Sequence, residues 1–141
     1  LNIDYQKVNA EDIAQRQPAE FDVVCCLEML EHVPDPAAVI AACATLAKPG
    51  AHLFFSTINR NPKAYAFAII GAEYVLKLLP RGTHEYGKFI RPSELTRWLR
   101  EAGLQLTDMT GLTYNPISKH YRLNSNDVSV NYMMHAIKPA L

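Results

Sequence analysis

Two mostly apolar runs, at 21–27 and 51–58, lie on either side of an apolar segment with helical character. The first run reads Phe-Asp-Val-Val-Cys-Cys-Leu, and a short run of this kind between polar residues is typical of a strand covered on both faces of a parallel sheet. Asp35 and Pro36 then supply a helix N-cap and first turn, apolar residues continue to Leu46, and Lys-Pro-Gly at 48–50 ends the helix. The pattern predicts a strand–helix–strand unit.

Outside that unit the pattern is weaker but still informative. It predicts further strands at 3–8, 104–113 and 128–137, the last two as hairpin partners with 121–123 between them. It also predicts a short helix or turn at 10–16 and helices at 63–81 and 94–102. Strand–helix–strand units followed by a β-rich end predict an α/β fold, with a mostly parallel sheet that has a reversed edge strand.

Length, charge balance and cysteine content limit the kinds of partner and the compartment that are expected for this chain. The chain has 141 residues, enough for one domain, and 49% of them are hydrophobic. Lys plus Arg and Asp plus Glu number 14 each, so no field of one sign attracts nucleic acid, and we expect no nucleic-acid partner. Three cysteines make no disulfide framework and no export signal is visible, which favours a reducing, cytoplasmic compartment.

Three titratable residues follow the first apolar run: Glu28, Glu31 and His32. Ligands of open α/β sheets bind beyond the carboxyl ends of the strands, which is where these residues are expected. If 28–32 forms one helical turn, the three share a face and could hold a divalent cation such as Mg²⁺. Alternatively, His32 could take a proton from a substrate hydroxyl, or the two carboxylates could simply be solvated. Spacing alone leaves these alternatives open.

The order of several segments resembles the later motifs of class I S-adenosylmethionine-dependent methyltransferases. These segments are 21–24, 30–36 and 46–57. A narrower resemblance is to the bacterial ubiquinone-biosynthesis O-methyltransferases. It is carried by 26–36, 55–61, 71–74, 80–84, 111–116 and 127–133, in the same order along nearly the whole chain.

The resemblance implies a Rossmann-like methyltransferase fold and methyl transfer from S-adenosylmethionine to phenolic oxygens. The implied substrates are polyprenyl phenols, 2-polyprenyl-6-hydroxyphenol and 3-demethylubiquinol, at two steps of ubiquinone synthesis. Carried over by position, Leu27 is similar to a cofactor-binding residue, and Asn-Ala-Glu at 9–11 occupies the place where such enzymes contact adenine. Glu28, Glu31 and His32 are similar to the family's metal ligands, with Mg²⁺ as the ion. His32 is also the candidate catalytic residue.

Two mechanisms follow from these assignments. With a bound cation, His32 is a ligand and the metal lowers the pKa of the phenol. Without one, His32 is the base and Glu31 orients it. The resemblance favours the metal version.

The family's glycine-rich loop and ribose-binding acidic residue have no counterpart among the six glycines here. The chain also begins with Leu1 and runs directly into strand-like residues. We therefore expect 1–141 to be the C-terminal part of a single class I methyltransferase domain whose N-terminal strands are missing. This piece alone is expected neither to bind S-adenosylmethionine well nor to turn over, because a glycine-rich turn lets the backbone approach the cofactor.

A helical apolar insertion is predicted at about 62–88, with its charged residues confined to one narrow stripe. Packing against the sheet is one interpretation, and contact with membrane surface lipids is the other. A polyprenyl substrate favours peripheral attachment to the inner face of the cytoplasmic membrane, and a ubiquinone-biosynthesis complex as a further partner. The alternatives are another small-molecule methyltransferase and a non-catalytic membrane-binding or assembly module.

Overall fold

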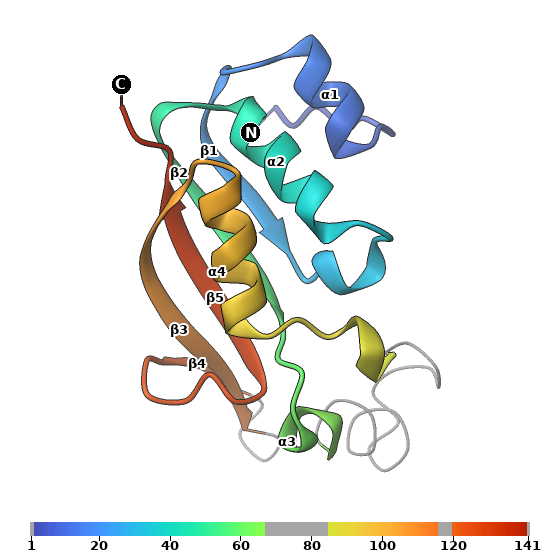
Figure 1. The fold of residues 1–141 in the computed structure, drawn as a ribbon, viewed down its shortest axis with the longest axis vertical. Coiled ribbons are helices and arrows are strands. Elements are labelled where there is room, and N and C mark those ends of the chain that lie inside the picture. Colours follow the sequence, from blue (N-terminus) through green and yellow to red (C-terminus); the bar gives the residue numbers. More distant parts are fainter. Residues whose placement is uncertain (1, 67–84, 116–119, 141) are drawn as a thin grey trace.

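The computed structural model describes residues 2–66, 85–115 and 120–140 (Figure 1). The helices are α1 (Ala10–Arg16), α2 (Pro36–Leu46), α3 (Pro62–Ala64) and α4 (Pro92–Glu101), with short 3-10 helices η1 (Leu30–His32) and η3 (Tyr86–Lys88). The strands are β1 (Phe21–Leu27), β2 (Ala47–Ile58), β3 (Gln105–Asn115), β4 (His120–Asn124) and β5 (Asn131–Ile137). The predicted strand–helix–strand unit is therefore confirmed as β1, α2 and β2.

The strands form one sheet in the order β1-β2-β5-β3-β4. β1 and β2 are parallel, whereas β5 runs antiparallel to both of its neighbours, β2 and β3, and β4 runs antiparallel to β3. The α/β fold is confirmed: β1, β2 and β3 run in one direction, and β4 at the edge of the sheet is reversed, as predicted. A second reversed strand, β5, lies inside the sheet, so three of the four strand pairings are antiparallel. The reason is that β3 pairs with β5 rather than with β2, so β5 is inserted between two strands of the opposite direction.

The predicted strand at 3–8 is wrong in this structure. No strand is assigned to residues 2–9, and a strand exists only where another strand satisfies its backbone groups. The predicted long helix at 63–81 lies largely outside the described residues, which include only its beginning, at α3.

One face of the sheet is packed against helices α2 and α4, which lie side by side in Figure 1. Leu53, Phe55, Tyr132 and Met134 point from β2 and β5 into this core, together with Leu95 and Leu99 from α4. Because successive side chains of a strand point to opposite faces, His52, Phe54 and Ser56 of β2 lie on the other face. There the ring of His135 stacks on Phe54.

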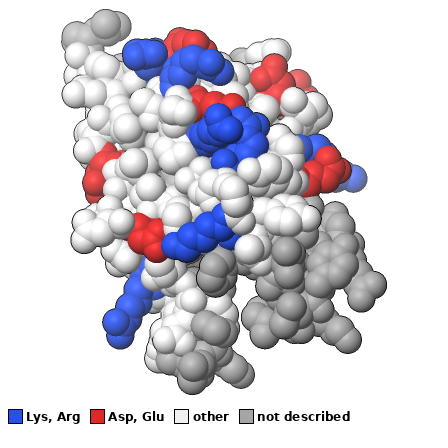
Figure 2. All heavy atoms as spheres, turned by 60° about the horizontal axis from the view of Figure 1, so that its bottom comes forward, with Lys and Arg blue, Asp and Glu red and all other residues white. Residues whose placement is uncertain are grey.

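Charges of both signs are interspersed on the surface. Figure 2 shows Lys and Arg atoms next to Asp and Glu atoms on the face that it draws. Among the described helices, none combines the length and the apolar character that a membrane crossing requires.

Candidate functional site

The candidate site begins where β1 ends, beside the carboxyl end of its parallel neighbour β2. Leu27 lies opposite Ser56 in the strand register. The backbone N–H of Glu28 then donates to the carbonyl oxygen of Ser56 (3.0 Å) and to its hydroxyl (3.1 Å). These bonds hold Glu28 at a φ of 51°, a left-handed conformation that residues other than glycine rarely adopt. The chain therefore turns sharply at Glu28 before η1 begins.

The side chain of Glu28 is fixed by two neighbours on adjacent strands. The Ser56 hydroxyl donates to Oε1 at 2.7 Å, and Nδ2 of Asn131 donates to Oε2 at 3.0 Å. Both partners belong to the sheet face opposite α2 and α4, so the Glu28 carboxylate lies toward that face.

The Glu31 carboxylate is directed to the other face. Its side chain is only 3% exposed, and the hydroxyl of Thr57 donates to Oε2 at 2.7 Å. Thr57 is the next residue after Ser56 on β2, so its side chain points toward the helices. Ser56 and Thr57, which are consecutive on β2, thus bind the Glu28 and Glu31 carboxylates on opposite faces of the sheet.

The Glu31 carboxylate affects the pKa of two neighbouring groups, the Tyr132 hydroxyl and the Cys26 thiol. Burial raises the pKa of the Tyr132 hydroxyl, and the carboxylates of Glu94 and Glu31 raise it further. A hydrogen bond with Cys43 lowers the pKa of the Cys26 thiol, while burial and Glu31 oppose that shift. A carboxylate enclosed in this way needs its hydrogen bond from Thr57.

His32 lies next to Glu31 at the edge of the core. Its Nε2 is 3.9 Å from Oε1 of Glu31, and its side chain is 48% exposed. The imidazole is therefore near a buried carboxylate, and about half of the side chain is exposed.

These positions correct the predicted geometry. Residues 28–32 do not form one helical turn, because the backbone of Glu28 is left-handed and η1 spans only Leu30–His32. In the part of the chain that the structure describes, no three His, Cys, Asp or Glu side chains form a group that could hold a metal ion. Glu28, Glu31 and His32 therefore do not form a three-ligand Mg²⁺ site in this arrangement, since the Glu28 and Glu31 carboxylates bind the hydroxyls of Ser56 and Thr57, which point to opposite faces of the sheet.

Of the predicted cofactor contacts, residues 9–11 line a groove beside this loop, and Leu27 is not among its lining residues. Leu27 is 49% exposed at the end of β1. Residues 9–11 line a groove of about 880 Å³ together with Met29 and Val33, which follow β1. Two segments that are separate in sequence thus border one open space, as one side of a cofactor site requires.

Three site residues could not be found by spacing: Ser56, Thr57 and Asn131. The first two carry a weak signal, because hydroxyl side chains interrupt an apolar strand just before its end. Asn131 is 103 positions from the carboxylate it binds, so only the pairing of β2 with β5 brings it there.

Comparison with known proteins identifies the fold and the relatives. A family model described as a methyltransferase domain matches residues 1–108. The chain is 69% identical over 138 residues to a protein of Saccharophagus degradans named ubiquinone biosynthesis O-methyltransferase, a match that covers 98% of this chain and 58% of the relative. A protein of the same name from Stutzerimonas stutzeri is also 69% identical, with 98% and 59% covered. The chain thus spans under two thirds of the length of these curated relatives.

A solved SAM-dependent methyltransferase from Thermotoga maritima has a similar fold, with a TM-score of 0.65. The match covers 86% of this chain and 58% of that chain at 14% identity, so it shows the fold alone. The Rossmann-like methyltransferase fold and the resemblance to ubiquinone-biosynthesis O-methyltransferases are both confirmed. Since the family model matches most of its length, the chain belongs to the methyltransferase-domain family.

Proposed function

We propose that the protein carrying this chain is an S-adenosylmethionine-dependent O-methyltransferase of ubiquinone biosynthesis. The names of relatives at 69% identity support this activity, and the arrangement of Glu31 and His32 supports a route to it. The proposed acceptors are polyprenyl phenols with adjacent hydroxyls, 2-polyprenyl-6-hydroxyphenol and 3-demethylubiquinol.

Methyl transfer to a phenol requires removal of the phenolic proton, because phenols have a pKa of about 10. The methylsulfonium group of the donor supplies an electrophilic carbon. The phenolic oxygen attacks this carbon while its proton passes to a ring nitrogen of His32. The oxygen–carbon bond forms, the carbon–sulfur bond breaks, and the sulfur leaves as a neutral thioether.

His32 suits the role of base because a buried carboxylate lies beside it. The positive charge that His32 gains is stabilised by Glu31, whose own position is fixed by Thr57. This proximity is the observation that carries the proposal. No step runs through a metal, because the three predicted ligands do not gather.

Leu27 and residues 9–11 are proposed to contact the donor. They supply only one side of a site, and no glycine-rich loop is present in the chain. We therefore expect the chain alone to show no binding of S-adenosylmethionine near micromolar concentration by calorimetry. Binding at that level would contradict the expectation.

Membrane contact through about 62–88 is a further part of the proposal, together with an inner-face, peripheral location. Tyr65 and Tyr86 are partly exposed, and their rings meet edge to face at 5.5 Å. Amphipathic aromatic rings suit a membrane–water interface. A ubiquinone-biosynthesis complex is also proposed as a partner.

The activity test uses a chimera in which this chain replaces the matching segment of the Saccharophagus degradans relative. We expect transfer of a labelled methyl group to a short-tailed 2-polyprenyl-6-hydroxyphenol. His32→Ala should lower kcat by about 10²-fold or more, the usual contribution of a general base. The matched control is His120→Ala on the exposed strand β4, which should leave kcat unchanged.

Two results would overturn the proposal. Absence of methyl transfer by the unaltered chimera rejects the activity. A strict requirement for a divalent cation, or near-normal kcat in His32→Ala, rejects His32 as the base.

A further inference from the structure

The loop between β4 and β5 is held in one shape by its own polar groups. Backbone N–H groups donate from Asp127 to the Asn124 carbonyl (3.1 Å), from Asn126 to Oδ1 of Asn124 (3.1 Å) and from Ser129 to Oδ1 of Asp127 (3.0 Å). The Ser129 hydroxyl also donates to the Asp127 carboxylate. We refer to residues 124–130 as the β4–β5 loop.

Gly111 of β3 lets this loop approach the sheet closely. A Cβ at position 111 would lie 1.7 Å from the carbonyl oxygen of Asp127 and 2.6 Å from its carbonyl carbon. No side chain fits there unless the backbone moves. The loop is therefore packed on β3 through its main chain.

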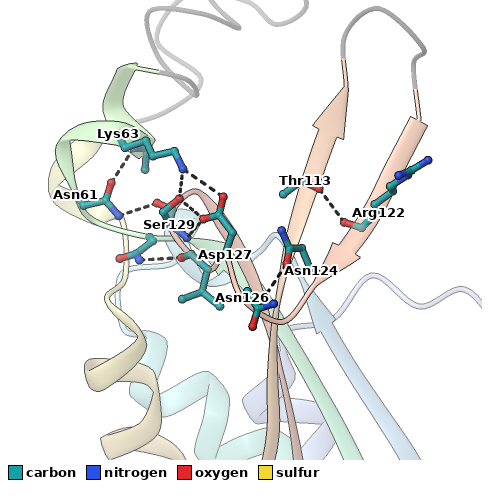
Figure 3. A network of polar contacts seen from close by, with 11 residues as sticks. Asn61, Lys63, Thr113, Arg122, Asn124, Asn126, Asp127 and Ser129 are labelled. Carbon is teal, nitrogen blue, oxygen red and sulfur yellow. Dashed lines mark hydrogen bonds and ion pairs between the residues drawn. The ribbon is translucent and has the colours of Figure 1, made fainter.

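The segment that follows β2 also binds the loop, through hydrogen bonds from its side chains (Figure 3). Nδ2 of Asn61 donates to the Ser129 carbonyl at 2.6 Å. Nζ of Lys63 donates to Oδ2 of Asp127 at 3.2 Å and to the Ser129 hydroxyl at 2.6 Å. Asn59 adds a bond from Nδ2 to the Val128 carbonyl at 3.0 Å.

The β4–β5 loop is followed directly by Asn131, a residue of the candidate site. Asn131 comes one residue after the loop and pairs with Ile58 at the end of β2. Its side chain donates to the Glu28 carboxylate. A shift of Ser129 is therefore expected to move Asn131, which is two residues further along the chain and donates to Glu28.

We propose that Lys63 and Asp127 are positioning residues for the phenolic acceptor, acting through Asn131 on Glu28. In this arrangement the Glu28 carboxylate accepts a hydrogen bond from a hydroxyl of a catechol-type acceptor. The inference rests on the proposed methyltransferase function, and it adds residues that contact neither donor nor acceptor.

The Asp127 carboxylate that Lys63 contacts keeps its charge down to acidic pH. Hydrogen bonds from the Ser129 hydroxyl and N–H, and then from Lys63, lower the pKa of Asp127 to about 2. The Lys63 and Asp127 side chains are 49% and 36% exposed, and ion pairs this exposed contribute little to folding stability. Loss of the pair should therefore change position without unfolding the protein.

The test compares Lys63→Met with Lys63→Arg in the chimera. Lys48→Met is the matched control, because Lys48 also forms an exposed ion pair, with Asp22, but at the opposite end of β2. Lys63→Met should raise the acceptor KM by about fivefold or more, as loss of one hydrogen bond's contribution would. Donor affinity and kcat should remain within about twofold. Lys63→Arg should restore the KM, and Lys48→Met should not change it.

A second readout does not depend on activity. The NMR signal of the Asn131 side-chain amide should shift in Lys63→Met, return in Lys63→Arg and stay in place in Lys48→Met. An unmoved amide, or an unchanged acceptor KM in Lys63→Met, overturns the inference. A shifted amide in a chimera that transfers no methyl group supports positioning while rejecting the proposed function.

Discussion

Replacing Thr57 by Val removes the hydroxyl that holds Glu31 and changes little else. The two side chains have almost the same shape, and Thr57 is fully buried on β2. Its hydroxyl donates to Oε2 of Glu31 at 2.7 Å. The variant therefore tests the bond that directs this carboxylate toward the core.

The expected magnitude follows from the charge and burial of the acceptor. Hydrogen bonds to charged groups contribute about 1.5–3 kcal/mol, and an acceptor left buried without its donor bears the desolvation cost. We expect Thr57→Val to lower the free energy of unfolding by about 2 kcal/mol. At about 2–4 °C per kcal/mol for a protein of this size class, Tm should fall by roughly 4–8 °C.

Urea denaturation of the chimera measures this loss, with Thr45→Val as control. The Thr45 hydroxyl donates to the Ala41 carbonyl on the exposed side of α2, so its removal should cost less than about 0.5 kcal/mol. A double variant with Glu31→Gln should lose less than the sum of the single variants, because the two residues share one interaction. A cost for Thr57→Val no larger than that of the control would refute the buried Thr57–Glu31 bond.

Three further predictions concern the loop and the surface. Gly111→Ala should destabilise the chimera by about 1–3 kcal/mol in urea denaturation, the usual range for overpacking; Gly87→Ala, which meets nothing within 4 Å, is its control, and equal effects would contradict the close approach. Because the folded state lowers the pKa of Asp127 to about 2, its contribution to stability is present above the unfolded value of about 4 and is lost as pH falls toward 2. The stability difference between the unaltered chimera and Asp127→Asn should close over that window, and a gap that persists at pH 2 argues against it. Ile69→Glu with Ile70→Glu should abolish co-sedimentation with anionic liposomes while circular dichroism stays unchanged, and retained binding rules out membrane contact there.

The sequence was most informative where local signals and burial agree. β1, α2 and β2 follow from an apolar run, the Asp35–Pro36 helix start and a second apolar run. β1 and α2 are found where predicted, whereas β2 begins at Ala47 rather than at 51 and includes the residues expected to follow the helix. The predicted strand at 3–8 failed because its alternation shows a preference, whereas a strand also requires a partner. The direction of β5 depends on pairing between distant segments, which periodicity does not encode.

The site shows the same limit on a smaller scale. The sequence places Glu28, Glu31 and His32 at the end of a strand, where the structure has them, but the helical turn that their spacing allows does not form. The conformation of Glu28 is set by Ser56, and the directions of the two carboxylates are set by Ser56, Thr57 and Asn131. These partners lie on other strands, so only the folded sheet reveals them.

The separation of the two carboxylates by β2 is tested most directly by diffraction from crystals of the chimera soaked in Mn²⁺. The account predicts Glu28 within hydrogen-bond distance of Ser56, Glu31 within hydrogen-bond distance of Thr57, and no anomalous peak shared with His32. An anomalous Mn²⁺ peak coordinated jointly by Glu28, Glu31 and His32 would contradict it.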